Sequence, residues 1–207
     1  RQLPAAAVVA AGHNPLLDLH RELVEGRMPD VCKKSWRAPG DVTEDEAMAV
    51  MVATGRQPLA MHGDRGLVRA SCEAYGDLVF GPLTRSFAFG VPSEGALACV
   101  ARHAPIVEIG AGSGYWAALL DARDCDVVAY DLTPPPRDGG EGPPGLFHGA
   151  FTDVLQGGPV ELEAHPDRAL LIVWPFAEKS ARPAGGDDWD TACLSHYGGG
   201  TGIYVGD

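Results

Sequence analysis

Basic residues are scarce in this chain. Its 207 residues include 16 Lys and Arg against 28 Asp and Glu, which gives a formal net charge of −12. A field of that sign repels the phosphates of nucleic acids and the anionic headgroups of membranes. Both are therefore discounted as partners, and a neutral or cationic small molecule suits the chain better.

Long apolar runs are also missing, because no stretch approaches the roughly 20 residues that a bilayer span requires. The five cysteines form no C-x-x-C pair. Their odd count and wide spacing favour reduced thiols in a cytoplasmic protein over a disulfide framework. Cys193 and His196 could share one face of a helix, but two ligands do not make a zinc site, so no metal is expected.

The local signatures of hydrolases are absent as well. The chain contains neither a G-x-S-x-G elbow nor an H-E-x-x-H motif. It has no internal repeat. The strongest chemical signal that remains is a glycine-rich stretch, "PIVEIGAGSGYW", at residues 105–116.

Residues 1–104 are predicted to form a helical region. Asn14 can cap one helix, residues 43–46 show a capping-box pattern for a second, and Ser93 can cap a third. We expect this region to cover a cofactor and to form much of the acceptor site.

Residues 105–207 alternate between strand and helix patterns and are predicted to form the cofactor-binding core. Strands are predicted at 105–110, 126–131, within 146–155, at 169–176 and at 201–207, and helices at about 115–122 and 188–197. In the stretch 133–145, nine of thirteen residues are Pro or Gly, which predicts a loop. Strands separated by helices predict a parallel sheet in an open α/β fold.

The glycine-rich turn follows the first of these strands. Gly110, Gly112 and Gly114 permit unusual backbone angles and let a ligand approach the backbone. One candidate ligand is NAD(P), whose fingerprint is G-x-G-x-x-G/A. Counted from Gly110, the sixth position is Tyr115, although a small residue is required there. Counted from Gly112 the motif matches formally, but Trp116 then stands where the pyrophosphate needs room, so a dinucleotide is the minor alternative.

S-Adenosylmethionine fits the same turn better, because it carries no phosphates and its ammonium and sulfonium groups are cationic. Glu108, near the end of the first strand, is placed to attract these charges. Asp131 ends the next strand, where a carboxylate can accept hydrogen bonds from both ribose hydroxyls. Adjacent parallel strands share their carboxyl edge, so the turn and Asp131 are expected to face one ligand.

At this point the sequence resembles the class I, seven-stranded S-adenosylmethionine-dependent methyltransferases. "VEIGAGSGYW" is similar to their motif I, "VVAYD" to the acidic end of their second strand, and "LLIVWPF" to their motif IV. Together with "FAFGVPSEGAL", "HPDRALLIVWPF" and "YVGD", these stretches resemble a little-described bacterial methyltransferase-like family over roughly residues 85–207. The resemblance implies a Rossmann-like, mostly parallel sheet that binds S-adenosylmethionine.

The sequence departs from that family in two places. Trp174, Pro175 and Phe176 stand where N-methyltransferases of this fold often carry Asp or Asn before Pro-Pro-Tyr, which disfavours an aliphatic amine as the acceptor. The fold normally adds two more strands after the fifth, whereas this sequence stops at Asp207. An incomplete set of C-terminal strands is therefore expected.

The candidate site residues follow from the turn and the resemblance together. Those expected to bind the cofactor are Glu108, Gly110, Gly112, Gly114, Tyr115, Asp131, Thr152 and Trp174. Those expected to bind the acceptor are Phe89, Trp174 and Phe176, and His148 is the candidate general base. Tyr115 is expected to face the ligand while Trp116 packs inward. For Thr152 and the aromatic acceptor candidates, ordinary roles in a turn or in the core stay open.

The predicted function is S-adenosylmethionine-dependent transfer of a methyl group to a small aromatic molecule, at carbon, oxygen or a ring nitrogen. The aromatic part depends on Trp174, whose π-face could stack such an acceptor. The family suggests a setting in specialised metabolism. Two alternatives stay open: a non-catalytic module that binds S-adenosylmethionine, and an NAD(P)-dependent oxidoreductase. The sequence indicates no oligomeric state.

Overall fold

The computed structural model describes residues 13–26, 81–136, 147–175 and 189–206, together with the single residues 30, 43, 45 and 79. Three predicted features lie outside the described residues: the helix after the 43–46 pattern, most of the loop at 133–145, and Phe176. Predictions about these features therefore stay predictions.

The chain divides into two compact units, and each is described by itself. The smaller unit runs over Asp18–Leu83, and the larger one joins the residues up to Leu17 with those from Thr84 onward. The helices within the smaller unit or at its ends are α2 (Pro15–Leu19), the π-helix η1 (His20–Gly26) and α6 (Gly81–Ser86). Residues 84–104 thus belong to the larger unit, while a functional division at residue 104 stays a prediction.

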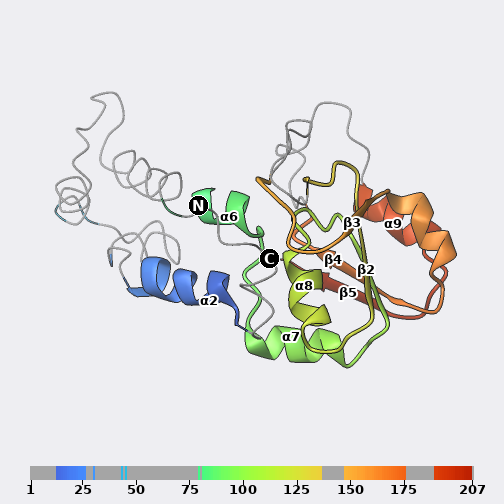
Figure 1. Ribbon diagram of the computed structural model, residues 1–207, viewed down its shortest axis with the longest axis horizontal. Coiled ribbons are helices and arrows are strands. Elements are labelled where there is room, and N and C mark those ends of the chain that lie inside the picture. Colours follow the sequence, from blue (N-terminus) through green and yellow to red (C-terminus); the bar gives the residue numbers. More distant parts are fainter. Residues whose placement is uncertain are drawn as a thin grey trace. The chain divides into compact units, whose positions relative to one another are not determined.

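The larger unit is built on the five-stranded sheet drawn in Figure 1. Its strands are β1 (Ile106–Ile109), β2 (Val127–Asp131), β3 (Val154–Gln156), β4 (Ala169–Val173) and β5 (Gly202–Val205). Their order is β3-β2-β1-β4-β5, and all four neighbouring pairs are parallel. The predicted α/β fold with a parallel sheet is confirmed.

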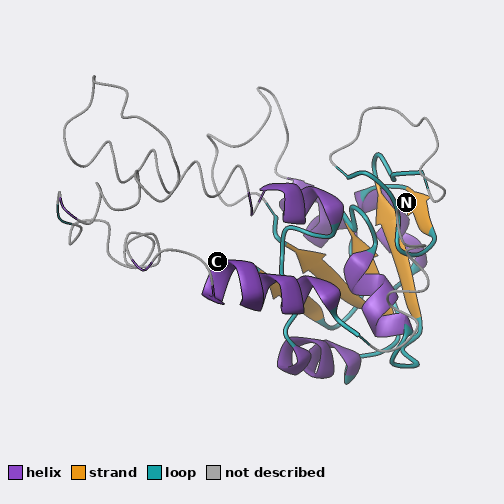
Figure 2. Ribbon diagram, turned by 60° about the vertical axis from the view of Figure 1, so that its left-hand side comes forward, coloured by secondary structure: helices purple, strands orange, loops and turns teal. Residues whose placement is uncertain are grey.

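Helices lie on both faces of this sheet (Figures 1 and 2). They are α7 (Glu94–Ala101), α8 (Tyr115–Asp121), the 3-10 helix η4 (Pro159–Ala164) and α9 (Trp189–His196). The core on the side of η4 and α9 gathers Val107, Ile109, Leu162, Leu170, Ile172 and Cys193. Because β1 and most of β4 are buried on both faces, their sequences are nearly continuous apolar runs.

Two helix starts are fixed by side chains that the sequence identified. Ser93 Oγ accepts the Ala96 N–H at 3.1 Å, and Asn14 Oδ1 accepts the Leu17 N–H at 3.2 Å. Both are N-cap bonds, which satisfy backbone donors that the first helical turn leaves unpaired. These two capping predictions are confirmed. Among the helices that the structure describes, none combines the length and the apolar character of a membrane span.

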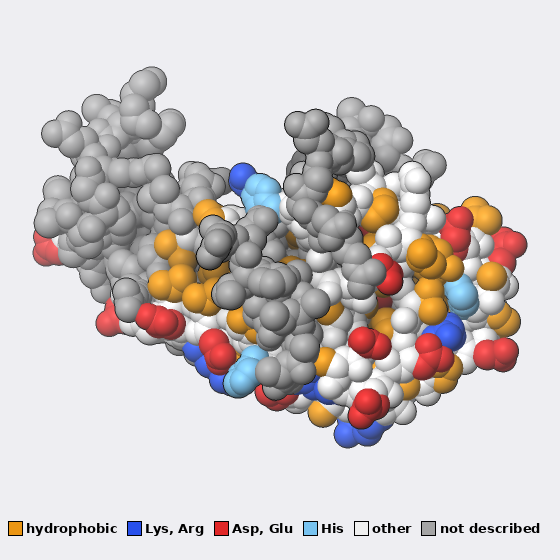
Figure 3. Space-filling model, viewed as in Figure 1, with side chains coloured by type: hydrophobic (Ala, Val, Ile, Leu, Met, Phe, Trp, Pro, Cys, Tyr) orange, Lys and Arg blue, Asp and Glu red, His pale blue; other side chains and the backbone are white. Residues whose placement is uncertain are grey.

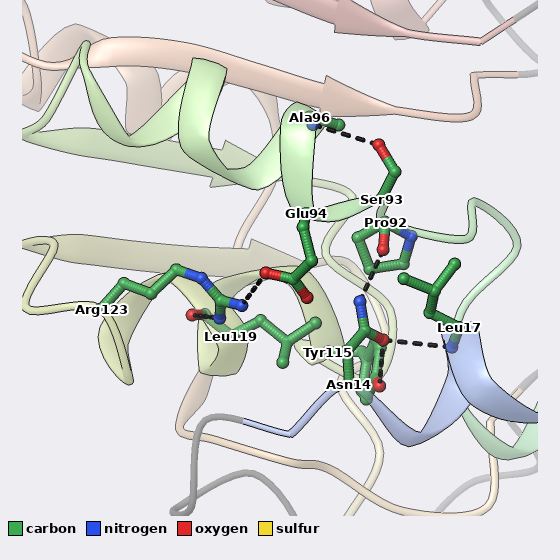
Figure 4. A network of polar contacts seen from close by, with 9 residues as sticks. All are labelled: Asn14, Leu17, Pro92, Ser93, Glu94, Ala96, Tyr115, Leu119 and Arg123. Atoms are coloured by element: carbon green, nitrogen blue, oxygen red, sulfur yellow. Dashed lines mark hydrogen bonds and ion pairs between the residues drawn. The ribbon is translucent and has the colours of Figure 1, made fainter.

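Tyr115 lies in the core, and Figure 4 shows its contact with Asn14. Its hydroxyl donates to Asn14 Oδ1 at 2.9 Å and accepts the Leu16 N–H at 3.1 Å. Its ring packs against Phe87 and Phe151, with centroid distances of 5.4 and 4.9 Å. The prediction that Tyr115 faces the ligand is therefore wrong for this conformation, because partners distant in the sequence hold it inside.

Tyr115→Phe is expected to lower the free energy of unfolding by about 1–2 kcal/mol, because the buried Leu16 N–H would lose its acceptor and Asn14 one of its donors. Tyr130→Phe is the matched control. It removes one partly buried contact, 3.0 Å from the Tyr130 hydroxyl to His165 Nε2, and should cost less. Urea denaturation at pH 7 measures both variants. Equal losses would contradict the role given to the Tyr115 network.

Candidate functional site

Three glycines shape the turn that follows β1. Gly110, Gly112 and Gly114 have φ angles of +69°, +56° and +68°, a region that strongly favours glycine. The strand order reverses between β1 and β4, so the turn lies at the point where the sheet changes winding direction. Open α/β sheets bind ligands at the carboxyl ends of their strands at such a point. The predicted turn therefore has both the conformation and the place of a ligand site.

Asp131, the last residue of β2, holds the turn in place. Its Oδ2 accepts the Gly112 N–H at 2.8 Å, and its Oδ1 accepts the Thr133 N–H at 2.8 Å. A carboxylate offers about four lone-pair sites, so each oxygen keeps further capacity. Asp131 is half-buried and can accept hydrogen bonds from a ligand without giving up the turn.

Glu108 is a buried acid in the middle of β1, with 2% of its surface exposed. Its neighbours Val107 and Ile109 face η4 and α9, so Glu108 points to the other side of the sheet. There its carboxyl accepts the backbone N–H of Ala117, while Oε2 has no hydrogen-bond partner. An open acceptor in such a position is costly unless a donor or a cation supplies the missing contact.

The surroundings of Glu108 disfavour the ionised form of its carboxyl. Burial is the main cause that raises the pKa of this carboxyl from 4.5 to about 8; the Ala117 N–H works in the opposite direction, and the negative charge of Asp131 adds to the increase. A cation placed between Glu108 and Asp131 would reverse that balance, because an opposite charge favours the ionised form.

Two aromatic rings lie directly against the glycine turn, and the sequence did not single them out. A Cβ at Gly110 would lie 2.9 Å from Trp189 Cη2, and a Cβ at Gly112 would lie 2.3 Å from Phe147 Cε2. Both glycines are therefore needed for close packing as well as for their φ angles. Trp189 begins α9 and Phe147 follows the Pro- and Gly-rich loop, so no sequence spacing connects either ring with the turn.

Thr152 lies beside the last glycine of the turn. A Cβ at Gly114 would lie 3.0 Å from Thr152 Cγ2 and 2.7 Å from Val154 Cγ2. The Phe151 N–H donates to the Ser113 carbonyl at 2.8 Å, which ties this segment to the turn. Thr152 is half-buried and precedes β3 rather than following it, and its contact with a cofactor stays a prediction.

The segment that carries Phe89 reaches the end of β4. The Trp116 Nε1–H donates to the Gly90 carbonyl at 2.9 Å, and a Cβ at Gly90 would lie 3.0 Å from Val173 Cγ1. Phe89 is half-buried and meets Phe147 edge to face, with a centroid distance of 5.5 Å. Phe89 and Phe147 thus connect the end of β4 with the glycine turn.

Trp174 and His148 are both exposed. Trp174, the residue after β4, has 40% of its surface exposed, so the alternative that it is buried core is wrong. His148 lies next to Phe147, and its backbone N–H donates to the Arg85 carbonyl at 3.3 Å. A role as general base stays a prediction for His148.

No protein-family model, curated protein or solved structure matches the chain. Within the part of the chain that the structure describes, no group of three or more His, Cys, Asp or Glu side chains is arranged to hold a metal ion. The chemistry available at the carboxyl edge is therefore that of two acids, a glycine turn and several aromatic rings.

Proposed function

We propose that this protein is an S-adenosylmethionine-dependent methyltransferase with a Rossmann-like fold. The observation that carries the proposal is the open oxygen of buried Glu108, close to Asp131 and just before the glycine turn. The order β3-β2-β1-β4-β5 supports the fold, since it matches the first five strands of the doubly wound order 3-2-1-4-5-6.

Charge favours a cationic ligand over a dinucleotide. The Asp131 carboxylate would repel a pyrophosphate, whereas an ammonium group would compensate it and favour ionisation of Glu108. Acidic side chains also prevail on the wider surface. On the face drawn in Figure 3 they are widely spread, and basic side chains are scattered singly among them. These features support S-adenosylmethionine and disfavour NAD(P).

The residues present fit this cofactor. Glu108 would balance the charge of the ammonium group, and Asp131 would accept hydrogen bonds from the ribose hydroxyls through its remaining lone pairs. A ligand that lies close to the backbone of the turn from Gly110 to Gly114 would take space that the rings of Trp189 and Phe147 occupy in this structure, so these rings would turn aside when it binds. Trp189 and Phe147 would stand beside it as apolar walls.

When bound, S-adenosylmethionine supplies an electrophilic methyl group: a nucleophilic atom of the acceptor bonds to the methyl carbon while the S–CH3 bond breaks, and its electron pair stays on sulfur in the neutral thioether product. The chain's own residues would orient the two reactants and exclude water. Glu108 and Asp131 would hold one end of the cofactor, and the carboxyl end of β4 would hold the acceptor beside it.

Asp131→Ala is expected to weaken the binding of S-adenosylhomocysteine about tenfold to a hundredfold. The change removes an acceptor for two hydroxyls, which corresponds to roughly 1–3 kcal/mol. Isothermal titration calorimetry of the whole chain with S-adenosylhomocysteine and with NADH measures this effect and tests the proposed function.

The control is Asp126→Ala, at the opposite end of β2, where the acid pairs with Arg168 at 2.9 Å. It removes a carboxylate of the same type from the far edge of the sheet and should leave ligand affinity nearly unchanged. Tight binding of NADH with no response to S-adenosylhomocysteine would overturn the proposal. Binding of S-adenosylmethionine without turnover of any acceptor would indicate a non-catalytic module.

A further inference from the structure

Trp174 has a strained backbone. Its φ angle is +52°, in the left-handed region, which costs roughly 1–2 kcal/mol for a residue with a side chain. Among the described residues, Asp124 is the other non-glycine with positive φ, and Asp tolerates that region far better than Trp. The Trp174 N–H donates to the Val205 carbonyl at 2.6 Å, which holds the strained residue against β5. Strain of this kind in a bulky residue clusters at functional sites.

The side chain of Trp174 is only partly buried. It is 40% exposed, and Tyr204 on the neighbouring strand is 56% exposed. The exposed part of the indole is apolar surface that a bound ligand could cover.

Strand register places Trp174 beside the glycine turn. Ile109 of β1 pairs with Ile172 of β4, so Gly110 is level with Val173, and Trp174 follows one residue later. The Phe89 segment meets the same strand end through the contact between Gly90 and Val173. Trp174 therefore lies at the carboxyl edge of the central strands, next to the proposed cofactor site.

The chemistry changes along this edge. The acids Glu108 and Asp131 belong to β1 and β2, whereas the stretches 169–175 and 202–206 at β4 and β5 contain no charged residue. An uncharged edge with a large π-face suits a flat apolar molecule better than an ammonium group. The indole N–H adds one hydrogen-bond donor, which suits a hydroxyl oxygen or a ring nitrogen.

We propose that Trp174 is the platform on which an aromatic acceptor, such as an indole or a phenol, stacks for methylation. This inference rests on the proposed function. Bond formation between the acceptor's carbon, oxygen or ring nitrogen and the methyl carbon accompanies cleavage of the S–CH3 bond. The sulfur keeps the electron pair, and the proton that the acceptor loses passes to water.

The test uses Trp174→Gly and Trp174→Phe in the whole chain. Glycine adopts a φ of +52° without strain, which offsets part of the packing that the variant removes, so Trp174→Gly should stay folded. Saturation-transfer NMR in the presence of S-adenosylhomocysteine measures binding of indole, 2-naphthol and cyclohexylmethylamine. The wild type should prefer both aromatic probes, Trp174→Gly should lose at least tenfold in affinity for them, and Trp174→Phe should keep part of it. Leu194→Ala, which alters an exposed apolar residue of α9, should match the wild type.

The two proposals fail in different ways. If S-adenosylhomocysteine binds normally but the aromatic probes bind the wild type and Trp174→Gly equally, or bind neither, the platform is wrong and the proposed function stands. If Trp174→Gly does not fold, Trp174→Phe carries the test, and unchanged affinity of that variant for both aromatic probes would show that the platform is wrong. If the probes depend on Trp174 but S-adenosylhomocysteine does not bind, the proposed function fails and the platform stands as a site for aromatic ligands.

Discussion

Replacing Glu108 with glutamine is expected to make the protein more stable at pH 8 and, at the same time, to weaken its binding of S-adenosylmethionine. Glutamine has nearly the shape of the protonated acid but cannot ionise. In the wild type, burial raises the pKa of Glu108 from 4.5 to about 8. The ionised carboxyl is thus strongly disfavoured in the folded state, and the variant removes that penalty.

The sign of the pH dependence follows from proton binding. Between pH 4.5 and about 8 the unfolded chain has lost the Glu108 proton while the folded chain retains it. Wild-type stability therefore falls through this window by about 1.4 kcal/mol per pH unit from this group, and the contribution levels off above it. The stability of Glu108→Gln relative to the wild type should rise with pH, to a total on the order of 3–5 kcal/mol.

Chemical denaturation of the wild type and the variant at several pH values between 5.5 and 8.5 measures the difference in their free energies of unfolding. The contributions of the other titrating groups largely cancel in that difference. Glu94→Gln, which removes an exposed acid paired with Arg123 at 2.7 Å, is the control for the same substitution at the surface. A difference for Glu108→Gln that does not change with pH would contradict the buried environment described for Glu108.

Ligand affinity separates a functional role for Glu108 from a structural one. A cation favours the ionised carboxyl, so wild-type affinity for S-adenosylmethionine should increase as pH rises towards 8, with release of a proton on binding. Titration calorimetry in two buffers of different ionisation enthalpy detects that proton. In Glu108→Gln the affinity should fall about tenfold or more, and the proton attributed to Glu108 should disappear. Unchanged affinity would mean that no cationic part of the ligand reaches this residue.

Local sequence signals predicted much of the fold. Ser93 and Asn14 cap helices through bonds to residues three positions away, so the neighbouring sequence is enough to identify them. Strands β1 and β4 are buried on both faces, and their apolar runs are visible without knowledge of their partners. The sequence did not predict η4, whose first turn depends on Glu161 accepting the Gly158 N–H at 2.6 Å.

The site was harder to predict, because its details depend on contacts between distant residues. The orientation of Tyr115 is fixed by Asn14, 101 positions away, through a hydrogen bond that no local pattern encodes. The rings of Trp189 and Phe147 reach the glycine turn only through the fold. Glycine spacing predicted where the backbone turns, but not which side chains lie against it.

The last prediction concerns that packing. Gly112→Ala is expected to lower the free energy of unfolding by about 2–4 kcal/mol and to weaken S-adenosylhomocysteine binding at least tenfold. An L-residue at φ +56° costs about 1–2 kcal/mol, and the new Cβ, 2.3 Å from Phe147 Cε2, would force the ring away from Phe89. Movement of the turn would also strain the 2.8 Å bond from Gly112 to Asp131.

Two further variants divide this effect into its causes. In Gly112→Ala combined with Phe147→Ala, the overlap with the ring is gone, so the loss should be smaller than the sum of the single losses by about 1 kcal/mol or more. The backbone cost at position 112 should remain. Gly202→Ala is the matched control: apart from its chain neighbours, no atom lies within 4 Å of its Cβ position, so its stability should change by less than about 0.5 kcal/mol. Strict additivity in the double variant would show that Phe147 does not pack against the turn. Full stability in Gly112→Ala would show that the turn has a different backbone conformation.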